Sequence, residues 1–436
     1  MELYNLVSLA GIFILAGVAW LCSSNRRVVN WRVITWGVIL QLSFALFIFL
    51  IPAGSRFFLF VNSMVVKVLE SATAGTKFVF GRLALPPGAI GEGGETSLGY
   101  ILGFQGLPTI IFFAGLVGAL YYLKIMPLVI RGFAYVFSRL MHISGAESLS
   151  ASSNIFVGIE SALVIQPHLK KMTRSELTTV LATGMATIAS TVLALYVFYL
   201  QDLLPTIAGH LVSASFLSAP AAVVMSKLIV PETGEPVTLG ISVKPHYERE
   251  DNIIMAIING AWSGLRLLGG IFTLLIAFLG IMALIDLVLG GAGGYLNQWF
   301  GLNLEWSLSG LLGYVFYPFA LLLGVPPADA TEVARLLGQR PIVTELAAYR
   351  ELAVLLENGD LIHPRSAIIA SYALCGFAHV ASLAIFVGGI SALAPERVKD
   401  LSRLGFRALL AATLACLMTG AVAGVFYTSG SILLGR

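Results

Sequence analysis

The sequence predicts an all-α polytopic membrane protein, with about eight transmembrane helices and two re-entrant helical hairpins arranged as inverted repeats. Of the 436 residues, 58% are hydrophobic and 11% are charged, whereas a soluble domain carries about 25% charged residues. Eight apolar segments reach the length of roughly 20 residues that a helix needs to cross hydrocarbon. Two further apolar segments, 145–169 and 309–348, are too interrupted to cross simply, so we expect them to be re-entrant.

The first apolar segment begins the series of predicted spans. It opens with Met1-Glu2, has no basic region and lacks a clear cleavage site, so we interpret it as a retained helix and not as a signal peptide. Residues 57–80 are predicted to form an interfacial helix, and the Gly- and Pro-rich residues 81–100 a loop. The predicted spans are 5–22, 31–52, 107–130, 178–200, 203–230, 267–290, 366–393 and 406–427.

A short motif occurs twice within the apolar segments. Residues 184–190 read GMATIAS, and residues 376–382 read GFAHVAS. Both copies interrupt a membrane-spanning pattern with small and hydroxyl residues, and each follows a segment with an isolated carboxylate, Glu160 or Asp329. Broken helices in corresponding positions of two halves are typical of transporters, whose solute site lies between the halves near the middle of the bilayer.

The distribution of basic residues predicts the orientation. Basic groups follow the first, third and fifth spans, precede the fourth and lie between the last two. The preference of Lys and Arg for the cytoplasmic side places these connections inside and both termini outside. Segment 145–169 then enters from the cytoplasm and 309–348 from the opposite side, which makes the two units inverted. The exceptions, near the second re-entrant segment, are Arg335, Arg340, Arg350 and Arg365.

This topology predicts four parts of the chain. Residues 1–130 form a scaffold of three spans and the interfacial helix, and 131–246 form the first repeat, with hairpin 1 and spans four and five. Residues 247–300 return to the scaffold as an interfacial helix and span six. Residues 301–436 form the second repeat, with hairpin 2 and the last two spans.

Several functional classes are excluded by what the sequence lacks. The net charge of +3 is scattered, without a basic patch interleaved with aromatics, so nucleic acid is not an expected partner. The three cysteines lie apart in apolar spans and form no disulfide or metal pattern. The sequence contains no His-Glu-x-x-His or Gly-x-Ser-x-Gly motif, which argues against an enzyme. Channels use rings of repeated groups, whereas these carboxylates are single, so a transporter without an organic cofactor is predicted.

Two carboxylates are candidates for solute binding. A charge at the centre of the bilayer costs at least about 2.5 kcal/mol, so Glu160 is expected to face a cavity. It would accept hydrogen bonds from a polar solute or, alternatively, from backbone N–H groups at the hairpin tip. Asp329 follows Pro326-Pro327, where it would bind solute hydroxyls or cap the helix that follows.

His379 and Ser382 are three residues apart and therefore share one helix face. His379 corresponds to Thr187 in the other motif copy, and histidine in general changes charge near physiological pH, so proton coupling is one alternative. A packed core residue is the other. Neutral oxygens at helix breaks suit Na⁺, although they also satisfy ordinary helix ends. The candidate Na⁺ ligands are Asn154, the Val157 carbonyl, Thr191 and the Val192 carbonyl.

Five parts of the chain resemble one known family. Residues 104–113, FQGLPTIIFF, resemble the opening of the third span in the concentrative nucleoside transporter family. Residues 154–158, NIFVG, together with Glu160 resemble the first hairpin tip of that family. The other matches are 172–177 with 184–189 to its fourth span, 213–220 and 231–233 to its fifth, and 373–378 to its seventh.

The resemblance implies a bacterial inner-membrane homotrimer in which a mobile domain moves against a scaffold like an elevator. It implies uphill nucleoside import driven by a Na⁺ or H⁺ gradient. Carried over to this sequence, it implies that Gly158 and Glu160 bind the base and that Asp329 and Ser382 bind the ribose. It also implies that Asn154, Val157, Thr191 and Val192 hold Na⁺.

The sequence departs from the family pattern where the solute is bound. The Gly-Gln-Thr-Glu-Ala-Pro tip of the family is shortened to residues 158–162, GIESA, and the Asn-Glu-Ala-Thr segment becomes residues 328–331, ADAT. His379 replaces an Asn, and Tyr196 replaces a small residue that lines the base pocket. We therefore add Ile159, Tyr196 and His379 to the predicted solute site. The alternative is an H⁺-coupled symporter of nucleosides or of a related nucleobase or ribosylated solute.

Overall fold

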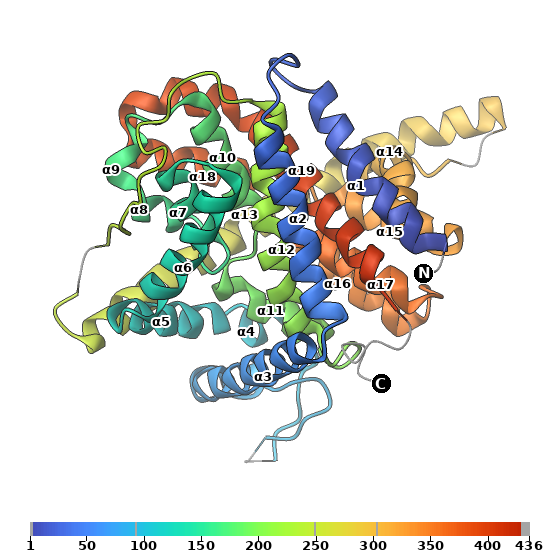
Figure 1. The fold of residues 1–436 in the computed structure, drawn as a ribbon. Coiled ribbons are helices and arrows are strands. Elements are labelled where there is room, and N and C mark those ends of the chain that lie inside the picture. Colours follow the sequence, from blue (N-terminus) through green and yellow to red (C-terminus); the bar gives the residue numbers. More distant parts are fainter. Residues whose placement is uncertain (1–2, 92–93, 248–249, 302–303, 429–436) are drawn as a thin grey trace.

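The computed structural model describes residues 3–91, 94–247, 250–301 and 304–428, and in these ranges the chain is helical without a β-strand (Figure 1). Eight helical segments are long and apolar enough to cross a membrane, which agrees with the predicted fold class. These segments are Leu3–Leu21, Trp31–Phe49, Pro52–Ala84, Leu102–Tyr122, Arg174–Leu200, Ile207–Ile229, Ile253–Phe300 and Pro395–Phe426.

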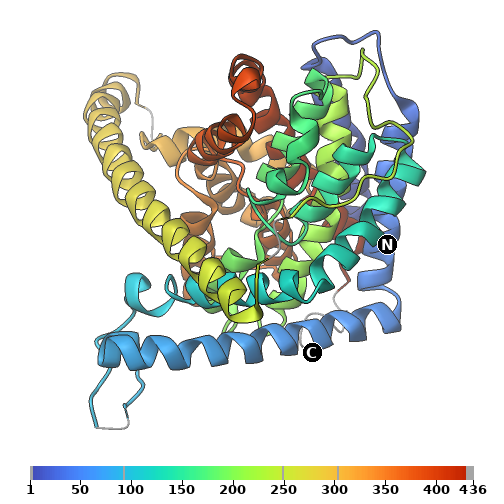
Figure 2. The ribbon, with the colours of Figure 1, turned by 90° about the vertical axis from the view of Figure 1, so that its left-hand side faces the viewer.

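The set of eight differs from the prediction in two segments. The predicted span 366–393 is divided into two shorter helices, and Pro52–Ala84 is long enough to cross instead. Helix α3 (Pro52–Phe80) nevertheless lies crosswise along the lower edge of the molecule in Figure 2, as expected for the predicted interfacial helix. The preceding helices are α1 (Leu3–Leu21) and α2 (Trp31–Phe49), and the following ones are η1 (Gly81–Ala84) and α4 (Leu102–Gln105).

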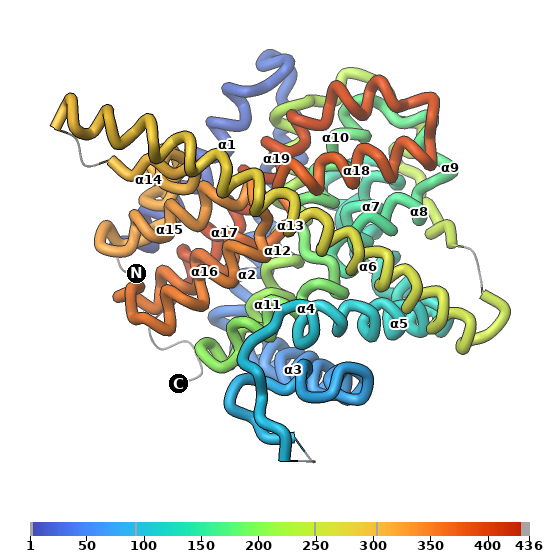
Figure 3. The backbone as a smooth tube through the Cα atoms, turned by 180° about the vertical axis from the view of Figure 1, so that it is seen from behind, coloured from blue at the N-terminus to red at the C-terminus, as the bar shows by residue number. Residues whose placement is uncertain are grey.

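Helices α5 (Thr109–Tyr122) and α13 (Ile253–Phe300) pack closely through small residues. A Cβ atom at Gly118 would lie 2.4 Å from the Ala256 carbonyl oxygen, and one at Gly260 would lie 2.5 Å from that of Ala114. Small residues of this kind allow helix backbones in membranes to approach one another. In Figure 3 helix α13 runs diagonally across the molecule.

Helix α13 is continuous over 48 residues. At about 1.5 Å per residue it is roughly 72 Å long, well beyond the hydrocarbon thickness of about 30 Å. The sequence had predicted an interfacial helix followed by a separate span at 267–290, and this division is wrong. Helix-forming residues continue through the boundary, because nothing between 253 and 300 removes the backbone hydrogen bonds or blocks the helical conformation.

The two repeats contain the same elements in the same order (Figure 1). Each has an entering helix, a hairpin, a broken helix and a long final helix. The first repeat consists of α6 (Ile125–Met141), α7 (Gly145–Asn154), α8 (Ser161–Val164), α9 (Gln166–Leu169), α10 (Arg174–Ala186), α11 (Ser190–Leu200) and α12 (Ile207–Ile229). The second consists of α14 (Leu308–Leu322), α15 (Pro327–Gln339), α16 (Glu345–Asn358), α17 (Pro364–Leu374), α18 (Val380–Leu393), η2 (Pro395–Arg397) and α19 (Val398–Phe426).

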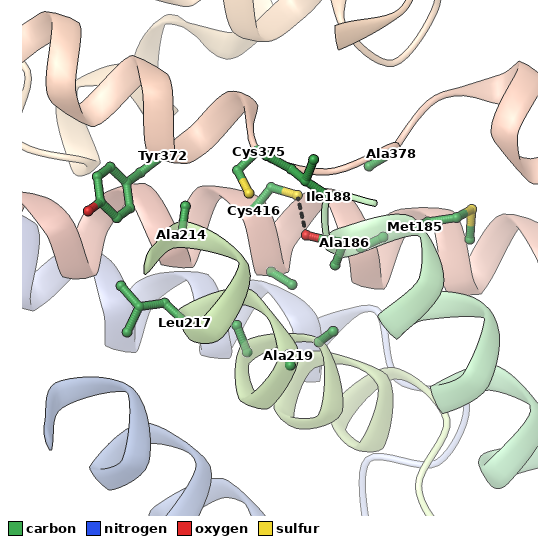
Figure 4. Close-up of a cluster of buried hydrophobic side chains, with 14 of the residues drawn as sticks. Met185, Ala186, Ile188, Ala214, Leu217, Ala219, Tyr372, Cys375, Ala378 and Cys416 are labelled. Atoms are coloured by element: carbon green, nitrogen blue, oxygen red, sulfur yellow. Dashed lines mark hydrogen bonds between the residues drawn. The ribbon is translucent and has the colours of Figure 1, made fainter. Parts of the chain in front are cut away.

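The two motif copies form the predicted helix breaks and cross each other. Extended residues separate α10 from α11 and α17 from α18. At the crossing Gly376 has φ +110°, and a Cβ atom there would lie 2.5 Å from the Ala186 carbonyl oxygen. The Cys416 thiol of α19 reaches the same oxygen at 3.6 Å, and small apolar side chains fill the core beside it (Figure 4). Close packing therefore holds the unwound backbone of both breaks in one place.

Hairpin 2 occupies different residues from those predicted. The sequence assigned 309–348 to this hairpin and treated Pro326-Pro327 as its interruption. In the structure Pro327 is the first residue of α15, where its missing N–H costs nothing. The hairpin therefore consists of α15 and α16, its tip is 340–344, and α14 is a separate helix.

Helices α1 and α2, which the sequence placed in the scaffold, pack against the repeats instead. Their main neighbours are α19 and α12, respectively. Buried Arg365 of α17 fastens α1 by donating to Asn5 Oδ1 at 2.7 Å and to Ser8 Oγ at 2.9 Å. The same guanidinium donates to the Gly324 and Gly424 carbonyls at 2.8 and 2.7 Å. Helices α1 and α2 are therefore packed more closely on the repeats than on α5 and α13.

Candidate functional site

A central cavity lies where the hairpin tips and the helix breaks meet. It encloses about 750 Å³ of space between atoms, part of which is open to the outside. Hairpin 1 contributes 158–160, hairpin 2 contributes 344–346, and the breaks contribute Ala189 and Phe377. The opposite side of the cavity is apolar and comes from α13, with Leu267, Ile271, Leu274 and Leu275.

One wall of the cavity, the hairpin 1 wall, consists of Gly158, Ile159, Glu160, Thr191 and Val192. Glu160 is exposed to the cavity, and its Oε2 lies beside the backbone of Gly158. No other described side chain forms a hydrogen bond or an ion pair with its carboxylate. The rest of this wall offers one hydroxyl, that of Thr191, among apolar groups.

The hairpin 2 wall consists of Thr344, Glu345, His379 and Ser382. It is the more polar wall, since each of its four residues carries a hydrogen-bonding side chain. The Glu345 carboxylate is nearly buried, at 5% exposure, and His379 Nε2 lies 3.0 Å from its Oε2. Its other oxygen, Oε1, accepts a hydrogen bond from the Tyr196 hydroxyl at 2.8 Å.

His379 and Ser382 also form the N-terminal cap of α18. The backbone N–H of Ser382 donates to His379 Nδ1 at 3.1 Å, and the Ser382 hydroxyl accepts from the His379 N–H at 3.2 Å. Nδ1 therefore acts as an acceptor, which leaves the ring hydrogen on Nε2, the nitrogen that lies 3.0 Å from Glu345 Oε2. The helix cap thus fixes the tautomer of His379 and its orientation in the wall.

Tyr196 supports the hairpin 2 wall from behind. It is fully buried, does not line the cavity, and stacks on Tyr349 with ring centroids 4.5 Å apart. The sequence had placed Tyr196 in the lining of the base pocket. Its structural contact is instead the carboxylate of Glu345, which it holds in place.

Glu345 is the functional candidate that sequence reasoning missed. The signal was present in Thr344-Glu345, because a hydroxyl residue followed by an acidic residue is a helix start. Thr344 indeed caps α16 by accepting from the Ala347 N–H at 3.4 Å. Recognising that start would have placed the hairpin tip at 340–344 and a carboxylate beside it, as in hairpin 1.

Asp329, the residue that the sequence placed at the solute, does not line the cavity. It is fully buried and accepts hydrogen bonds from the N–H groups of Ile362 and His363 at 2.9 and 3.0 Å and from the Ser366 hydroxyl at 2.5 Å. These donors surround the N-terminus of α17. The alternative of a capping role therefore fits better than the solute role, although the capped helix is α17 and not α15.

The four predicted Na⁺ ligands fall into two groups. Asn154 is fully buried, and its Nδ2 donates to the Ser150 carbonyl and to Thr183 Oγ1 at 3.0 and 3.2 Å. Among the described residues its Oδ1 has no hydrogen-bond partner. Val157 follows in the same hairpin tip, whereas Thr191 and Val192 belong to α11 and line the central cavity.

A second, larger cavity adjoins the first and measures about 1350 Å³ between atoms, part of which is open to the outside. The two share Gly158, Glu160 and Thr191, so hairpin 1 separates them. Its far side is formed by α5, the start of α13 and the segment that contains His246 and Tyr247.

The electrostatics of the central cavity limit its ligands. Two carboxylates, Glu160 and Glu345, contribute to its walls, and no Lys or Arg is among its described lining residues. An anionic solute such as a nucleotide would be repelled, because charges interact strongly away from water. The site is suited to an uncharged solute that donates hydrogen bonds.

Three family models match nearly the whole chain: Na⁺ dependent nucleoside transporter N-terminus at 10–83, nucleoside recognition at 103–202, and Na⁺ dependent nucleoside transporter C-terminus at 210–424. The nucleoside permease NupC of Helicobacter pylori is 36% identical over 425 residues, which cover 97% of this chain and 98% of that protein. An uncharacterized transporter of Haemophilus influenzae is 36% identical over 433 residues, covering 98% and 99%.

Solved structures of CNTnw are also similar. The inward-facing, substrate-bound state shares 33% identity with a TM-score of 0.86 and covers 97% of this chain and 98% of that one. An outward-facing variant of CNTnw gives 32% identity, the same TM-score and the same coverage. The fold described above is therefore one that is known in both inward- and outward-facing states.

Proposed function

This multi-pass membrane protein belongs to the concentrative nucleoside transporter family, which consists of transporters and not enzymes. On that premise we propose that it imports nucleosides in symport with Na⁺. The observation that supports this most directly is the central cavity between two hairpin tips. It offers two hydrogen-bond-accepting carboxylates without a cationic side chain among its described lining residues. A nucleoside is uncharged and rich in O–H and N–H donors, and it matches that lining.

We place the sugar at the hairpin 2 wall and the base at the hairpin 1 wall. A ribose presents several hydroxyls, which suit the four polar side chains around Glu345. A base is flat and largely apolar with polar groups on its edge, which suits Ile159 and Val192 with Glu160 among them. In this arrangement His379 and Ser382 bind the sugar, Gly158 lets the base approach the backbone, and Tyr196 acts through Glu345.

We place Na⁺ at the unpaired Oδ1 of Asn154. A buried amide oxygen without a donor costs free energy unless a cation or water fills the gap. The Val157 carbonyl remains a candidate ligand. On α10, Thr187 bonds to the Thr183 carbonyl at 2.9 Å, and Thr183 Oγ1 accepts from Asn154. Thr191 and Val192 are the remaining candidate ligands, and both also line the central cavity.

Proton coupling through His379 is the less favoured alternative. Protonation at Nδ1 would remove the acceptor that caps α18 at the Ser382 N–H. The resulting cation would also sit at a helix N-terminus, where positive charge is unfavourable. The observation in favour of this alternative is the 3.0 Å separation between His379 Nε2 and Glu345, which would stabilise a charged ring.

The walls of the cavity come from two bodies, as an elevator mechanism requires. The hairpins and breaks belong to the repeats, whereas the apolar side comes from α13 of the scaffold. Movement of the repeats past α13 would carry the solute from one side to the other. The largely exposed apolar surface of α13 supports our proposal of a homotrimer. The bacterial relatives lead us to propose a bacterial plasma membrane, and the distribution of basic residues leads us to propose that both termini are periplasmic.

The proposal is tested by uptake of labelled nucleosides into proteoliposomes that contain the purified protein. An inward Na⁺ gradient should drive accumulation above the external concentration, and replacement of Na⁺ by choline at constant pH should stop it. Asn154→Ala should raise the Na⁺ concentration needed for half-maximal uptake about tenfold or more, because it removes one ligand, whereas Asn25→Ala, at an exposed site, should not. Accumulation that persists in choline and collapses with a protonophore would refute Na⁺ coupling.

A further inference from the structure

The hairpin 1 wall carries only one charged side chain to recognise a base. Glu160 is that side chain, and the remaining members of the wall are Gly158, Ile159, Thr191 and Val192. Its carboxylate is exposed to the cavity, with no other described side chain as a partner. Backbone N–H groups of Gly158 and Glu160 lie against the carboxylate, so a base in the cavity would meet the lone pairs that these groups leave free.

An ionised carboxylate accepts hydrogen bonds and cannot donate them. Its two oxygens are suited to two donors side by side, the arrangement used when it pairs with planar N–H groups. The leucines and isoleucine of α13 face this wall, and in a cavity with little water each such bond is stronger. A lone pair on the ligand next to the carboxylate is correspondingly unfavourable.

Resting on the proposed function, we propose that the solute is a purine nucleoside whose base presents two adjacent N–H donors, which is the guanosine class. Guanine offers its ring N1–H beside its 2-amino group, so both oxygens of Glu160 receive a hydrogen bond. The ring then lies between Ile159 and Val192 of the wall and the apolar side chains of α13.

The other common bases match this carboxylate less well. Hypoxanthine keeps the N1–H but has a C–H where guanine has the amino group. Adenine and cytosine place an acceptor nitrogen beside their amino group, and uracil flanks its single N–H with two carbonyl oxygens. Each of these bases leaves one oxygen of Glu160 without a donor or brings a lone pair toward it. A site built to bind N–H groups discriminates strongly against analogues that lack them.

The test is competition against labelled guanosine, measured with the purified full-length protein in Na⁺-containing buffer. Unlabelled guanosine should compete about tenfold or more better than inosine, which corresponds to the loss of one hydrogen bond to a charged group. Adenosine and uridine should be weaker than inosine. Uridine or adenosine binding as tightly as guanosine would overturn the inference but leave a nucleoside transporter. Failure of every nucleoside to bind would overturn both the inference and the proposed function.

A charge-neutral variant provides a second measurement. Glu160→Gln replaces two acceptors by one acceptor and one donor. An amide can pair with the adjacent donor and acceptor that all four bases present, so the 2-amino group of guanine no longer gives an advantage. We expect guanosine affinity to fall about tenfold or more and the four nucleosides to come within about threefold of each other. Glu357→Gln, at an exposed site on α16, should retain the original ranking. An unchanged guanosine preference in Glu160→Gln would show that Glu160 does not read the base.

Discussion

Replacing Lys227 by methionine should destabilise the first repeat without touching the central cavity. Lys227 lies on α12 and is only 4% exposed, and its ammonium is 2.5 Å from the Glu147 carboxylate of hairpin 1. The same ammonium lies 3.3 Å from Glu232 and donates to the Ser175 hydroxyl at 3.0 Å. One buried cation thus joins hairpin 1, the start of α10 and the end of α12.

The expected magnitude follows from the burial of both partners. Glu147 is 1% exposed, and removing its cation leaves a buried carboxylate uncompensated, which costs about 3–5 kcal/mol. A destabilisation of that size should lower the unfolding temperature of a chain of 436 residues by about 3–5 °C. The double variant Lys227→Met with Glu147→Gln removes both charges, and replacement of a complete buried pair is often nearly neutral. It should therefore recover at least half of the loss.

The measurement is thermal unfolding of each purified variant in the same detergent and Na⁺ concentration. Lys244→Met is the matched control, because Lys244 is exposed on the segment that follows α12, and it should unfold within about 1 °C of the unmodified protein. A Lys227→Met variant as stable as this control would refute the reasoning. If the double variant unfolds as early as the single one, the uncompensated charge is not the cause of the instability.

Two further substitutions test the close packing where the two helix breaks cross and the capping role of Asp329. Gly376→Ala places a side chain at a residue whose backbone has positive φ, close to the Ala186 carbonyl oxygen. It should lower the free energy of unfolding by about 1–3 kcal/mol and reduce uptake. The control in the unfolding and uptake assays is Gly388→Ala, because a Cβ atom at Gly388 meets nothing within 4 Å. Asp329→Asn should cost about 1–3 kcal/mol with unchanged nucleoside affinity, because an amide cannot accept from all the donors at the start of α17. The control is Asp360→Asn, at an exposed site. If Asp329→Asn is as stable as the unmodified protein but binds nucleoside more weakly than Asp360→Asn does, Asp329 contributes to the solute site.

The difference between Asp329 and Glu345 shows how far sequence reasoning reached in hairpin 2. Two prolines before Asp329 were interpreted as a break at membrane depth, although Pro327 begins a regular helix. A proline restricts its local backbone, but it does not reveal how deep that backbone lies. Which of two carboxylates in one hairpin reaches the cavity depends on where the chain reverses, and Thr344 marks that point only weakly in the sequence.

Hairpin 1 was easier because Glu160 is the single Asp, Glu, Lys or Arg between residues 148 and 169. Five of the seven residues predicted for the solute site line one cavity in the structure: Gly158, Ile159, Glu160, His379 and Ser382. Tyr196 was predicted to line the cavity, whereas in the structure it lies behind the wall and donates a hydrogen bond to Glu345. Helical periodicity relates residues within α11, whereas the side that faces the cavity is set by how α11 packs against α16.

The sequence by itself determined the membrane environment, the internal duplication and the two helix breaks, because hydrophobic length and the placement of small residues act locally along the chain. Only the tertiary structure decided that α1 and α2 pack against the repeats, that Glu345 and not Asp329 lines the central cavity, and that the Asn154 amide oxygen has no hydrogen-bond donor among the described residues. These properties arise from contacts between segments far apart in the chain. Their free energies depend on distances and orientations that no local pattern of residues contains.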